Sequence, residues 1–366
     1  MTKSLTLPTQ PYKGARDFYP EEMRIRNYIF EIWRKTCKSF GYEEYDGPFL
    51  ESYEIYAAKS GEELVNEQLY SFEDRGGRKV AIRPEMTPSL ARMVAGQYKT
   101  LIKPIKWFSI PNLWRYEKPQ RGRLREHFQL NVDVFGVQGV EADFEIISLL
   151  YTIMKNVGAI DGMFEIRIGN RRLINDFYNS IGISQEKGLR VTKALDKKPK
   201  ISYDDFIAML KEDAQVSDHE ISKVTDFLKN PDKIIESLEE TSEGAKEVQK
   251  LLKLAEASDM RYFVKYDPTV MRGLDYYTGN VFELFDLNPK NNRAMCGGGR
   301  YDDLVELFIG EKLTGIGFGM GDVTFVNFLE EWKLLPKFES EIDYFITLWP
   351  TENVYEQEKF FNVART

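Results

Sequence analysis

The sequence is poor in the residues that build metal centres, disulfide frameworks and catalytic triads. Its 366 residues include two Cys and two His. Cys37 and Cys296 lie too far apart in sequence to form a disulfide framework, and they share no metal-ligand spacing with His127 and His219. These shortages argue against a zinc-type site held by protein ligands and against any triad that needs histidine.

Long apolar runs and an excess of positive charge are also missing. No apolar stretch approaches the roughly 18 residues that a membrane span needs, and residues 1–13 contain no signal-peptide core. The balance of 50 Lys and Arg against 58 Asp and Glu gives a net charge of −8, which argues against a surface coated with basic groups. We therefore expect a cytoplasmic enzyme or binding protein without membrane contact.

Several common nucleotide and hydrolase motifs are absent as well. The sequence has no GxxxxGK[ST] phosphate loop, no GxGxxG between a strand and a helix, no HExxH and no GxSxG. What the chain does have is an ordinary globular composition, with 42% apolar and 30% charged residues, and a length that suggests two or three domains.

The first hundred residues show helix and hairpin signals. Apolar residues recur at helical spacing up to Phe40, which predicts a long amphipathic helix that begins at Pro20 and ends before Gly41. Three further elements are expected from turn and cap signals. They are an edge strand within Tyr42–Leu50, interrupted by Pro48, and a hairpin of Leu69–Glu73 with Lys79–Arg83, followed by a helix with Thr87 as its N-cap.

A basic segment lies between two expected strands, Ile105–Glu117 and Glu126–Phe135. From Arg115 to Arg125 (RYEKPQRGRLR) it contains five basic residues and one acid, which predicts a positively charged hairpin loop. Alternation in the second strand places four polar side chains on one face, so that this face lines a wet site or an edge. These side chains are His127, Gln129, Asn131 and Asp133.

The middle of the chain changes character. From about 172 to 257 charged helical patterns replace strand signals, with a capping-box pattern from Ser217 to Glu220 and a Pro-started helix within Asn230–Leu238. Strand signals return at Arg261–Tyr266 and Asn280–Phe285, and a final helix is expected at Val323–Leu334. Hairpins and helices without βαβ repeats predict an α+β fold, an antiparallel sheet flanked by helices with a helical insertion.

Two features point to a nucleotide, and each has a plain alternative. Gly315, Gly317, Gly319 and Gly321 recur at period two, so one strand face is bare backbone that a planar ring can approach, or against which another element packs tightly. The segment Arg115–Arg123 offers guanidinium groups for phosphate and Glu117 for an exocyclic amine, unless it is only a solvated hairpin tip.

The chain resembles the histidyl-tRNA synthetases, a family of class II aminoacyl-tRNA synthetases, over nearly its whole length. The pair RGLDYYTG and RPEMTP is the most specific part of this resemblance. The matching segments are Gly14–Pro20 (GARDFYP), Arg83–Pro88 (RPEMTP), Arg115–Gly136, Leu195–Lys200 (LDKKPK), Arg272–Gly279 (RGLDYYTG) and Gly298–Asp302 (GGRYD).

The resemblance implies a two-step reaction and assigns the residues that serve it. Histidine reacts with ATP, assisted by Mg²⁺, to give histidyl-adenylate, and the 3′ end of tRNA(His) then receives the histidyl group. Arg115 and Arg272 are the implied catalytic residues. The implied ATP-binding set is Arg115, Glu117, Arg123, His127, Gly319 and Gly321. The implied histidine-binding set is Glu85, Thr87, Gln129, Asp133, Arg272, Tyr276 and Tyr277.

Two positions depart from the family pattern. Thr324 stands where the third motif usually carries an arginine for the ATP γ-phosphate, next to Asp322, which suits a helix cap better than a phosphate neighbour. We therefore expect weaker triphosphate binding, or a contribution from Arg123 or Arg125. His127 stands where a phenylalanine commonly stacks on adenine, and an imidazole can either stack there or simply pack.

The resemblance also implies the domain layout and the assembly. Residues 1–335 correspond to the catalytic domain, and 336–366 to a linker and the start of an anticodon-binding domain that looks incomplete, with a strand at Ile342–Trp349 and a helix at Glu356–Val363. Pro48 resembles the proline at the homodimer interface. The alternative is a regulatory subunit of ATP phosphoribosyltransferase, which shares the fold and senses histidine without charging tRNA.

Overall fold

The structure is a computed structural model that describes residues 7–58, 60–61, 63–271, 276–291, 293–338, 358–359 and 362–363. The chain divides into two compact units, Met1–Leu334 and Leu335–Thr366. In the second unit the expected strand at 342–349 lies outside the described residues. Of the helix expected at 356–363, residues 358–359 and 362–363 are described, and these are helical.

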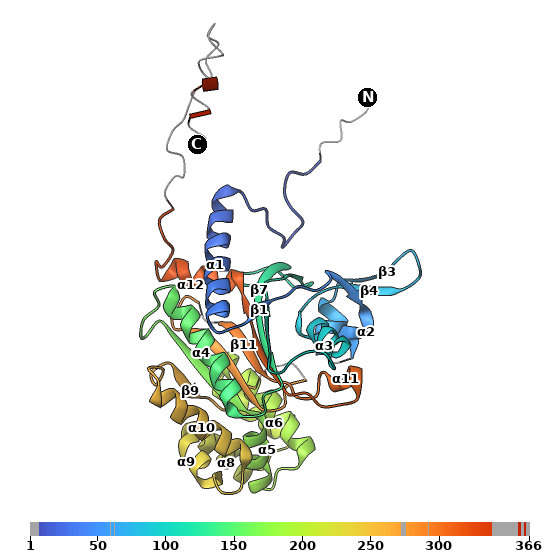
Figure 1. The fold of residues 1–366 in the computed structure, drawn as a ribbon. Coiled ribbons are helices and arrows are strands. Elements are labelled where there is room, and N and C mark those ends of the chain that lie inside the picture. The colour runs from blue at the N-terminus through green and yellow to red at the C-terminus, as the bar shows by residue number, and fades with distance from the viewer. Residues whose placement is uncertain are drawn as a thin grey trace, which may run out of the picture. The chain divides into compact units, whose positions relative to one another are not determined.

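A sheet of nine described strands forms the centre of the first unit (Figure 1). Eight of them follow one another in the order β1-β5-β7-β12-β11-β10-β8-β9. In that order their bounds are Glu43–Glu44, Ile105–Ser109, Glu126–Phe135, Gly315–Gly321, Ala294–Arg300, Asn280–Asp286, Phe164–Asn170 and Val264–Tyr266.

The sheet is mixed, whereas the sequence predicted an antiparallel one. Its interior pairs are antiparallel, but β1 pairs with β5 and β8 pairs with β9 in parallel. Each parallel pair is joined by a long stretch of intervening chain, which a parallel connection needs. Of the expected Tyr42–Leu50 strand, Glu43–Glu44 forms β1, which lies at the edge of this sheet as predicted, whereas Leu50 begins a strand of a second sheet.

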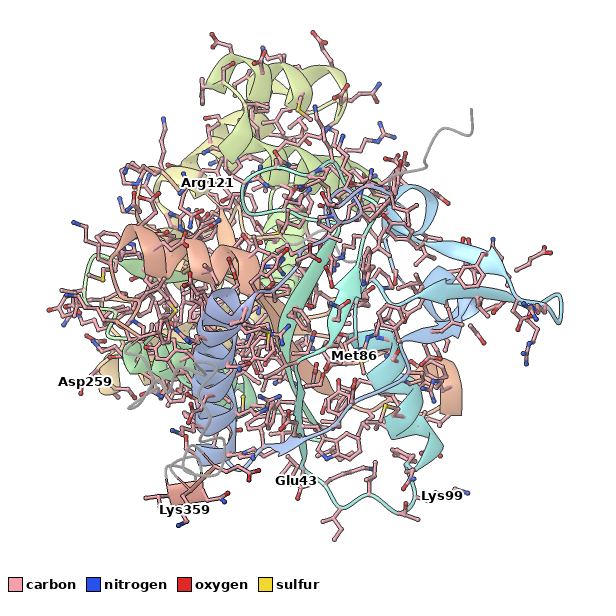
Figure 2. The ribbon with its side chains drawn as sticks, turned by 90° about the horizontal axis from the view of Figure 1, so that it is seen from above. Glu43, Met86, Lys99, Arg121, Asp259 and Lys359 are labelled. Atoms are coloured by element: carbon pink, nitrogen blue, oxygen red, sulfur yellow. The ribbon has the colours of Figure 1, made fainter. Side chains whose placement is uncertain are left out.

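The basic segment is a hairpin loop, as predicted, but the strand that leads into it is broken. β5 ends at Ser109, and β6 (Asn112–Trp114) pairs separately with the first part of β7. Pro111 lies at the break and has no backbone N–H to give to a sheet. Arg121 lies in this loop, on the same side of the molecule as the end of α12 (Figure 2).

The glycine strand β12 lies beside β7, and its predicted alternation of buried side chains with bare backbone is confirmed. Ile316, Phe318 and Met320 are buried, at most 4% exposed. A Cβ atom at Gly317 would lie 2.2 Å from Oδ1 of Asp133, so the side chains of β7 use the space above the glycines. The bare face therefore also borders the cavities described below.

Helices cover one face of the sheet (Figure 1). Phe128 of β7 lies on this face, where it contacts Phe30, and His127 and Gln129 alternate to the other face. These helices are α1 (Pro20–Ser39), α4 (Val140–Asn156) and α12 (Asp322–Glu331). The helix expected from Pro20 is confirmed, and Gly41 follows it with φ = +78°, a conformation that glycine adopts at no steric cost. Phe30 of α1 packs edge-on against Phe128.

A second, three-stranded sheet holds the predicted hairpin. Its order is β2 (Leu50–Ser52), β4 (Lys79–Ile82) and β3 (Ser71–Glu73), with α2 (Tyr53–Ala57) and a π-helical turn η1 (Leu64–Gln68) between β2 and β3. Thr87 is not an N-cap, contrary to expectation, but the first residue of α3 (Thr87–Gly96). Met86 holds the cap position with helical backbone angles and without a side-chain cap hydrogen bond, and Pro88 is the second residue of the helix.

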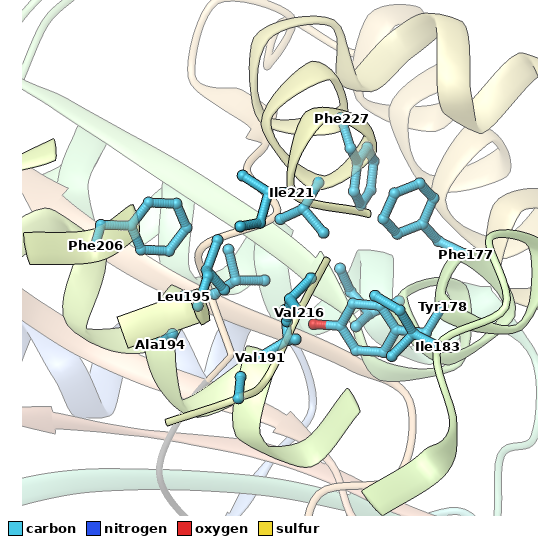
Figure 3. Packing of buried hydrophobic residues seen from close by; sticks show 14 of the residues in the cluster. Phe177, Tyr178, Ile183, Val191, Ala194, Leu195, Phe206, Val216, Ile221 and Phe227 are labelled. Atoms are coloured by element: carbon cyan, nitrogen blue, oxygen red, sulfur yellow. The ribbon is translucent and has the colours of Figure 1, made fainter. Parts of the chain in front are cut away.

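Residues 171–257 are helical, as predicted. The elements are α5 (Arg171–Ser180), α6 (Gln185–Lys197), the 3₁₀ turn η2 (Lys198–Lys200), α7 (Tyr203–Glu212), α8 (Asp218–Lys229), α9 (Pro231–Leu238) and α10 (Glu243–Ala257). The capping box of Ser217 and Glu220 is present at the start of α8. The insertion has its own apolar cluster, in which the rings of Phe177 and Phe227 lie 4.5 Å apart (Figure 3).

A buried polar chain connects the insertion to the sheet. Nδ2 of Asn170, at the end of β8, donates to Oδ1 of Asn280 at 2.7 Å and to Glu247 of α10 at 2.9 Å. Nδ2 of Asn280 donates in turn to Asp143 of α4, which forms an ion pair with Arg300 of β11. Buried polar groups are costly unless they are paired, and these pair with one another.

Candidate active site

The basic loop, β7, β11 and β12 enclose a cavity of about 180 Å³, which we call the loop cavity. All six residues expected around ATP line it. They are Arg115, Glu117, Arg123, His127, Gly319 and Gly321. The structure therefore brings together residues of the loop, of β7 and of β12, which are distant from one another in sequence.

The charges of the loop cavity are held by specific contacts. Nε of Arg115 donates to the carbonyl of Pro84 at 2.8 Å, which fixes the direction of the guanidinium group. Nε of Arg123 lies 2.9 Å from Oε2 of Glu117, whose side chain is 9% exposed. The cavity thus combines a fixed guanidinium with a carboxylate that is itself held in place.

His127 contributes a neutral ring to this cavity. Burial, together with the positive charges of Arg115 and Arg16, lowers the pKa of His127 to about 3. The imidazole therefore carries no charge near neutral pH, and it offers a flat, uncharged surface to a second ring.

The other two loop arginines are engaged elsewhere. Nη1 of Arg125 donates to the Tyr12 hydroxyl at 2.6 Å, and its guanidinium lies 4.0 Å from the ring centre of Tyr116. Arg121 forms an ion pair with Glu331 of α12. Of the two arginines suggested for triphosphate, Arg123 lines the cavity and Arg125 is not among the lining residues.

The position of Asp322 differs from the expected cap. Gly321 holds the cap position, and Asp322 is the first residue of α12. Its carboxylate lies 2.7 Å from Nη2 of Arg16 and accepts a hydrogen bond from the backbone N–H of Phe128 at 3.0 Å. Thr324 lines the loop cavity, and its hydroxyl donates to the carbonyl of Gly321 at 3.2 Å.

A second, narrower cavity of about 50 Å³ adjoins the first, and we call it the tyrosine cavity. Five of the residues expected around histidine line it: Glu85, Thr87, Gln129, Tyr276 and Tyr277. Glu85 is 4% exposed and accepts hydrogen bonds from the hydroxyls of Ser60 at 2.6 Å and Tyr276 at 3.0 Å. A buried carboxylate with these donors is suited to an ammonium group.

Asp133 lies behind the wall of the tyrosine cavity. Its Oδ1 accepts a hydrogen bond from the hydroxyl of Tyr301, which lines the cavity. Its Oδ2 is buried and has no hydrogen-bond partner among the described residues. Burial raises the pKa of Asp133 to about 7, and the hydrogen bond from Tyr301 acts in the opposite direction.

The two cavities meet at shared residues. Arg115, Gln129, Gly297 and Gly319 line both of them. Arg272, the second arginine expected at the reacting centre, lies outside the described residues. The arrangement places a guanidinium where the contents of the two cavities would touch.

Sequence reasoning did not single out two residues of the tyrosine cavity region. Tyr301 lies in the GGRYD segment, and its place directly after a glycine-rich strand was the available signal. Ser60 carries no local signal, because its partner Glu85 is 25 residues away along the chain.

The part of the chain that the structure describes has neither a metal-binding cluster nor a membrane-spanning helix. No group of three or more His, Cys, Asp or Glu side chains there is placed to hold a metal ion. No described helix combines the length and the apolar character that crossing a bilayer requires.

Comparison with known proteins identifies the family. A family model described as histidyl-tRNA synthetase matches residues 14–322. The histidine–tRNA ligase of Leptospira biflexa serovar Patoc (strain Patoc 1 / Ames) is 47% identical over 368 residues, which cover 99% of this chain and 84% of that relative. The chain belongs to the histidyl-tRNA synthetase family.

Other members and solved structures agree with this assignment. The chloroplastic/mitochondrial histidine–tRNA ligase of Arabidopsis thaliana is 39% identical over 92% of this chain and 69% of its own length. The histidyl-tRNA synthetase structure from Nostoc sp. PCC 7120 shares the fold, with a TM-score of 0.78 at 24% identity over 90% of this chain and 77% of that one.

One solved structure bears both family names that the sequence suggested. An ATP phosphoribosyltransferase regulatory subunit/histidyl-tRNA synthetase from Bacillus halodurans C has a TM-score of 0.76 at 26% identity, covering 89% of this chain and 84% of that chain. The expected α+β synthetase fold is confirmed by these neighbours.

Proposed function

We propose that this synthetase-family chain activates histidine with ATP and transfers the histidyl group to the 3′ end of tRNA(His). The observation that carries the proposal is the meeting of the loop cavity and the tyrosine cavity at Arg115. A nucleotide in the first and an amino acid in the second would bring a carboxylate and an α-phosphate together at this guanidinium.

Each cavity has the chemistry of one substrate. In the tyrosine cavity, Glu85, Gln129 and Thr87 would hold the ammonium group, while Tyr276, Tyr277 and Asp133 would surround the imidazole. In the loop cavity, Glu117 would accept a hydrogen bond from the adenine amino group. His127 would face the adenine ring from one side, with the bare backbone of Gly319 and Gly321 nearby.

The reaction needs no protein nucleophile. The histidine carboxylate attacks the α-phosphorus of ATP and pyrophosphate leaves, and a ribose hydroxyl at the tRNA 3′ end then displaces AMP from the adenylate. Arg115, with Arg272, would stabilise the negative charge that develops on the α-phosphate. Holding both substrates in one geometry supplies the remaining acceleration.

Mg²⁺ would enter this site mainly as a partner of the ATP phosphates. This ion keeps several waters and is commonly bound through substrate phosphates and one or two carboxylates. When bound, Mg²⁺ would neutralise part of the charge of the triphosphate.

Histidine-dependent exchange of pyrophosphate into ATP tests the proposal. We expect exchange in the wild-type protein and a loss of about 10²–10³ in rate for Arg115→Ala, because a fixed charge at the reacting centre is removed. Arg190→Ala, which breaks an exposed ion pair with Glu186 on the insertion, should leave exchange unchanged. Absence of exchange in the folded wild-type protein would contradict the proposal.

The same assay separates the regulatory alternative. A histidine sensor of the ATP phosphoribosyltransferase kind would bind histidine in a calorimeter and show no exchange. The arrangement of Arg115, Glu117 and Arg123 around the loop cavity favours the synthetase, because a sensor of histidine alone has no use for a nucleotide cavity.

We further propose that the protein is a cytoplasmic homodimer. The small sheet next to Pro48 supports the dimer, because it exposes large apolar side chains. Phe49, Leu50 and Phe72 are 44%, 42% and 49% exposed. Exposed apolar patches next to strand edges are suited to burial against a second copy.

A further inference from the structure

The segment Gly14–Phe18 joins the base of the basic loop to the start of α12. The carbonyl of Gly14 accepts hydrogen bonds from the backbone N–H groups of Arg125 and Glu126, both at 3.0 Å. The backbone N–H of Arg16 donates to Oε2 of Glu126 at 3.0 Å, and its Nη2 donates to Asp322 at 2.7 Å. One short segment thus holds two of the elements that line the loop cavity.

Asp322 faces away from the loop cavity, although its neighbours in sequence line it. Gly321, Val323 and Thr324 are on the wall of the loop cavity. Asp322 instead lines a separate cavity of about 180 Å³ between the N-terminal segment, α1 and α12, together with Arg16. The Arg16–Asp322 contact therefore lies directly behind the place where we expect ATP.

We propose that Arg16 is a positioning residue for the ATP site, which holds and neutralises Asp322 so that this carboxylate does not act against the bound triphosphate. The inference rests on the proposed function, since it assumes that the loop cavity takes ATP. Neither the family pattern nor the comparisons assign a role to Arg16.

The burial of the pair makes neutralisation necessary. The side chain of Asp322 is 4% exposed and that of Arg16 is 24% exposed. Burial raises the pKa of Asp322, and the charge and hydrogen bond of Arg16 act in the opposite direction. Without Arg16, the carboxylate would be left either as an unpaired negative charge or as a neutral acid at a higher pKa.

The other charged groups around this pair do not replace Arg16. Arg26 also interacts electrostatically with Asp322, but its guanidinium lies over the rings of Phe18 and Phe128, 4.7 and 5.1 Å from their centres, and among the described residues it forms no ion pair with that carboxylate. His127 is neutral because its pKa is lowered to about 3. The charged groups that face the pair are Asp17, Glu22, Arg26, Glu126 and Glu330.

The loop cavity has few cationic side chains, so an extra negative charge nearby would weaken ATP binding strongly. Thr324 stands at the position where the family usually has an arginine. The arginines among the described residues that line the cavity are Arg115 and Arg123, and Arg123 already pairs with Glu117. An unpaired carboxylate of Asp322, at the start of α12, would therefore meet little opposing charge from the loop cavity.

The test uses Arg16→Met in the full chain. The Michaelis constant for ATP in pyrophosphate exchange should rise about tenfold at alkaline pH, where Asp322 is ionised, and should rise less as the pH is lowered and the carboxyl, whose pKa is raised by burial, takes up a proton. The Michaelis constant for histidine should stay unchanged. Calorimetric titration with ATP should show the same pH-dependent loss of affinity.

Further variants separate charge from packing. Arg16→Lys keeps the charge and should retain wild-type ATP affinity. The double variant Arg16→Met/Asp322→Asn should recover most of the ATP affinity that Arg16→Met loses, because no carboxylate is left at position 322. Arg34→Met is the matched control, because it breaks an exposed ion pair between Arg34 of α1 and Glu44 of β1. If Arg16→Met does not fold, Arg16→Gln takes its place with the same expected result.

Three results would overturn the inference. They are unchanged ATP affinity in a folded Arg16 variant, equal rises in the constants for ATP and histidine, and a rise that neither pH nor Asp322→Asn reverses. A wild-type protein without exchange would instead contradict the proposed function, and the ATP titrations would still decide the role of Arg16.

Discussion

The hydroxyl of Tyr301 donates a hydrogen bond to the carboxylate of Asp133 across the glycine strand that separates them. Asp133 belongs to β7, Tyr301 follows β11, and Gly317 of β12 pairs with Asp133 in the register between them. The contact is possible because Gly317 has no side chain. It joins a buried acid to the wall of the tyrosine cavity.

Asp133→Asn should weaken histidine binding and leave ATP binding largely unchanged. The amide keeps the shape of the side chain but removes the negative charge that an imidazole N–H would meet at a pH above about 7, the raised pKa of Asp133. Hydrogen bonds to charged groups contribute about 1.5–3 kcal/mol, so histidine affinity should fall roughly tenfold to a hundredfold. Separate calorimetric titrations with histidine and with ATP measure this, and an equal loss for both ligands would contradict the assignment.

The same substitution should change how stability depends on pH. The pKa of Asp133 is raised to about 7 in the folded protein, above the ordinary value near 3.9 for an unfolded chain. The folded state therefore binds the proton more tightly, and the wild-type protein loses stability as pH rises from about 4 to about 7.

The Asp133→Asn variant should not lose stability in this way as the pH rises, because its amide does not titrate. The stability of the wild type relative to the variant should fall by about 1.4 kcal/mol per pH unit across that window and stay level above it. Denaturant unfolding of both proteins at several pH values measures the difference. A difference that stays flat, or one that grows with pH, would show that the carboxyl is not kept protonated by burial.

Gly317→Ala should damage the histidine site. A Cβ at this position would lie 2.2 Å from Oδ1 of Asp133 and 2.5 Å from the carbonyl oxygen of Val132, so β7 and β12 would have to move apart. We expect destabilisation of about 1–3 kcal/mol and a loss of histidine affinity. Gly96→Ala is the control, because a Cβ there meets nothing within 4 Å; equal effects of the two would contradict the prediction.

Arg272→Ala should depress histidine-dependent pyrophosphate exchange by about 10²–10³. The expectation rests on the family resemblance, which places this arginine beside the reacting carboxylate and α-phosphate. Circular dichroism and thermal melting check that the fold is retained. Near-normal exchange in a folded variant would remove Arg272 from the catalytic residues.

Leu50→Asp should dissociate the proposed dimer. Leu50 is 42% exposed on β2, and a carboxylate there would be buried without a partner on assembly. Light scattering at micromolar concentration should show a dimer for the wild type and a monomer for the variant. Leu189→Asp, at a position 61% exposed on the insertion, should remain dimeric, and a monomeric wild type would contradict the assembly proposal.

Local periodicity was enough to predict most elements of the site. The alternation that puts His127 and Gln129 on one face of β7 needs only neighbouring residues, and both side chains do line the loop cavity. The period-two glycines likewise predicted β12. These patterns depend on backbone geometry that repeats every two residues.

Contacts between distant residues were not predictable in the same way. The ion pair of Arg16 and Asp322 spans 306 positions, and nothing near Asp322 indicates that its partner comes from the N-terminal segment. The local signal suggested a helix cap, which was wrong. The break at Pro111 was missed because the hydrophobic pattern continues through it, whereas the backbone hydrogen bonding does not.

The polar chain through Asn170, Asn280 and Asp143 should couple the unfolding of the insertion to that of the sheet. Its hydrogen bonds cross from the insertion to three separate elements of the sheet layer, so the insertion cannot open without exposing unpaired groups in the neighbouring strands and helix. Although its helices possess an apolar cluster of their own, their amide protons should exchange with solvent in the same cooperative event that releases β8 and β10. The insertion would then behave as part of one foldon with the sheet.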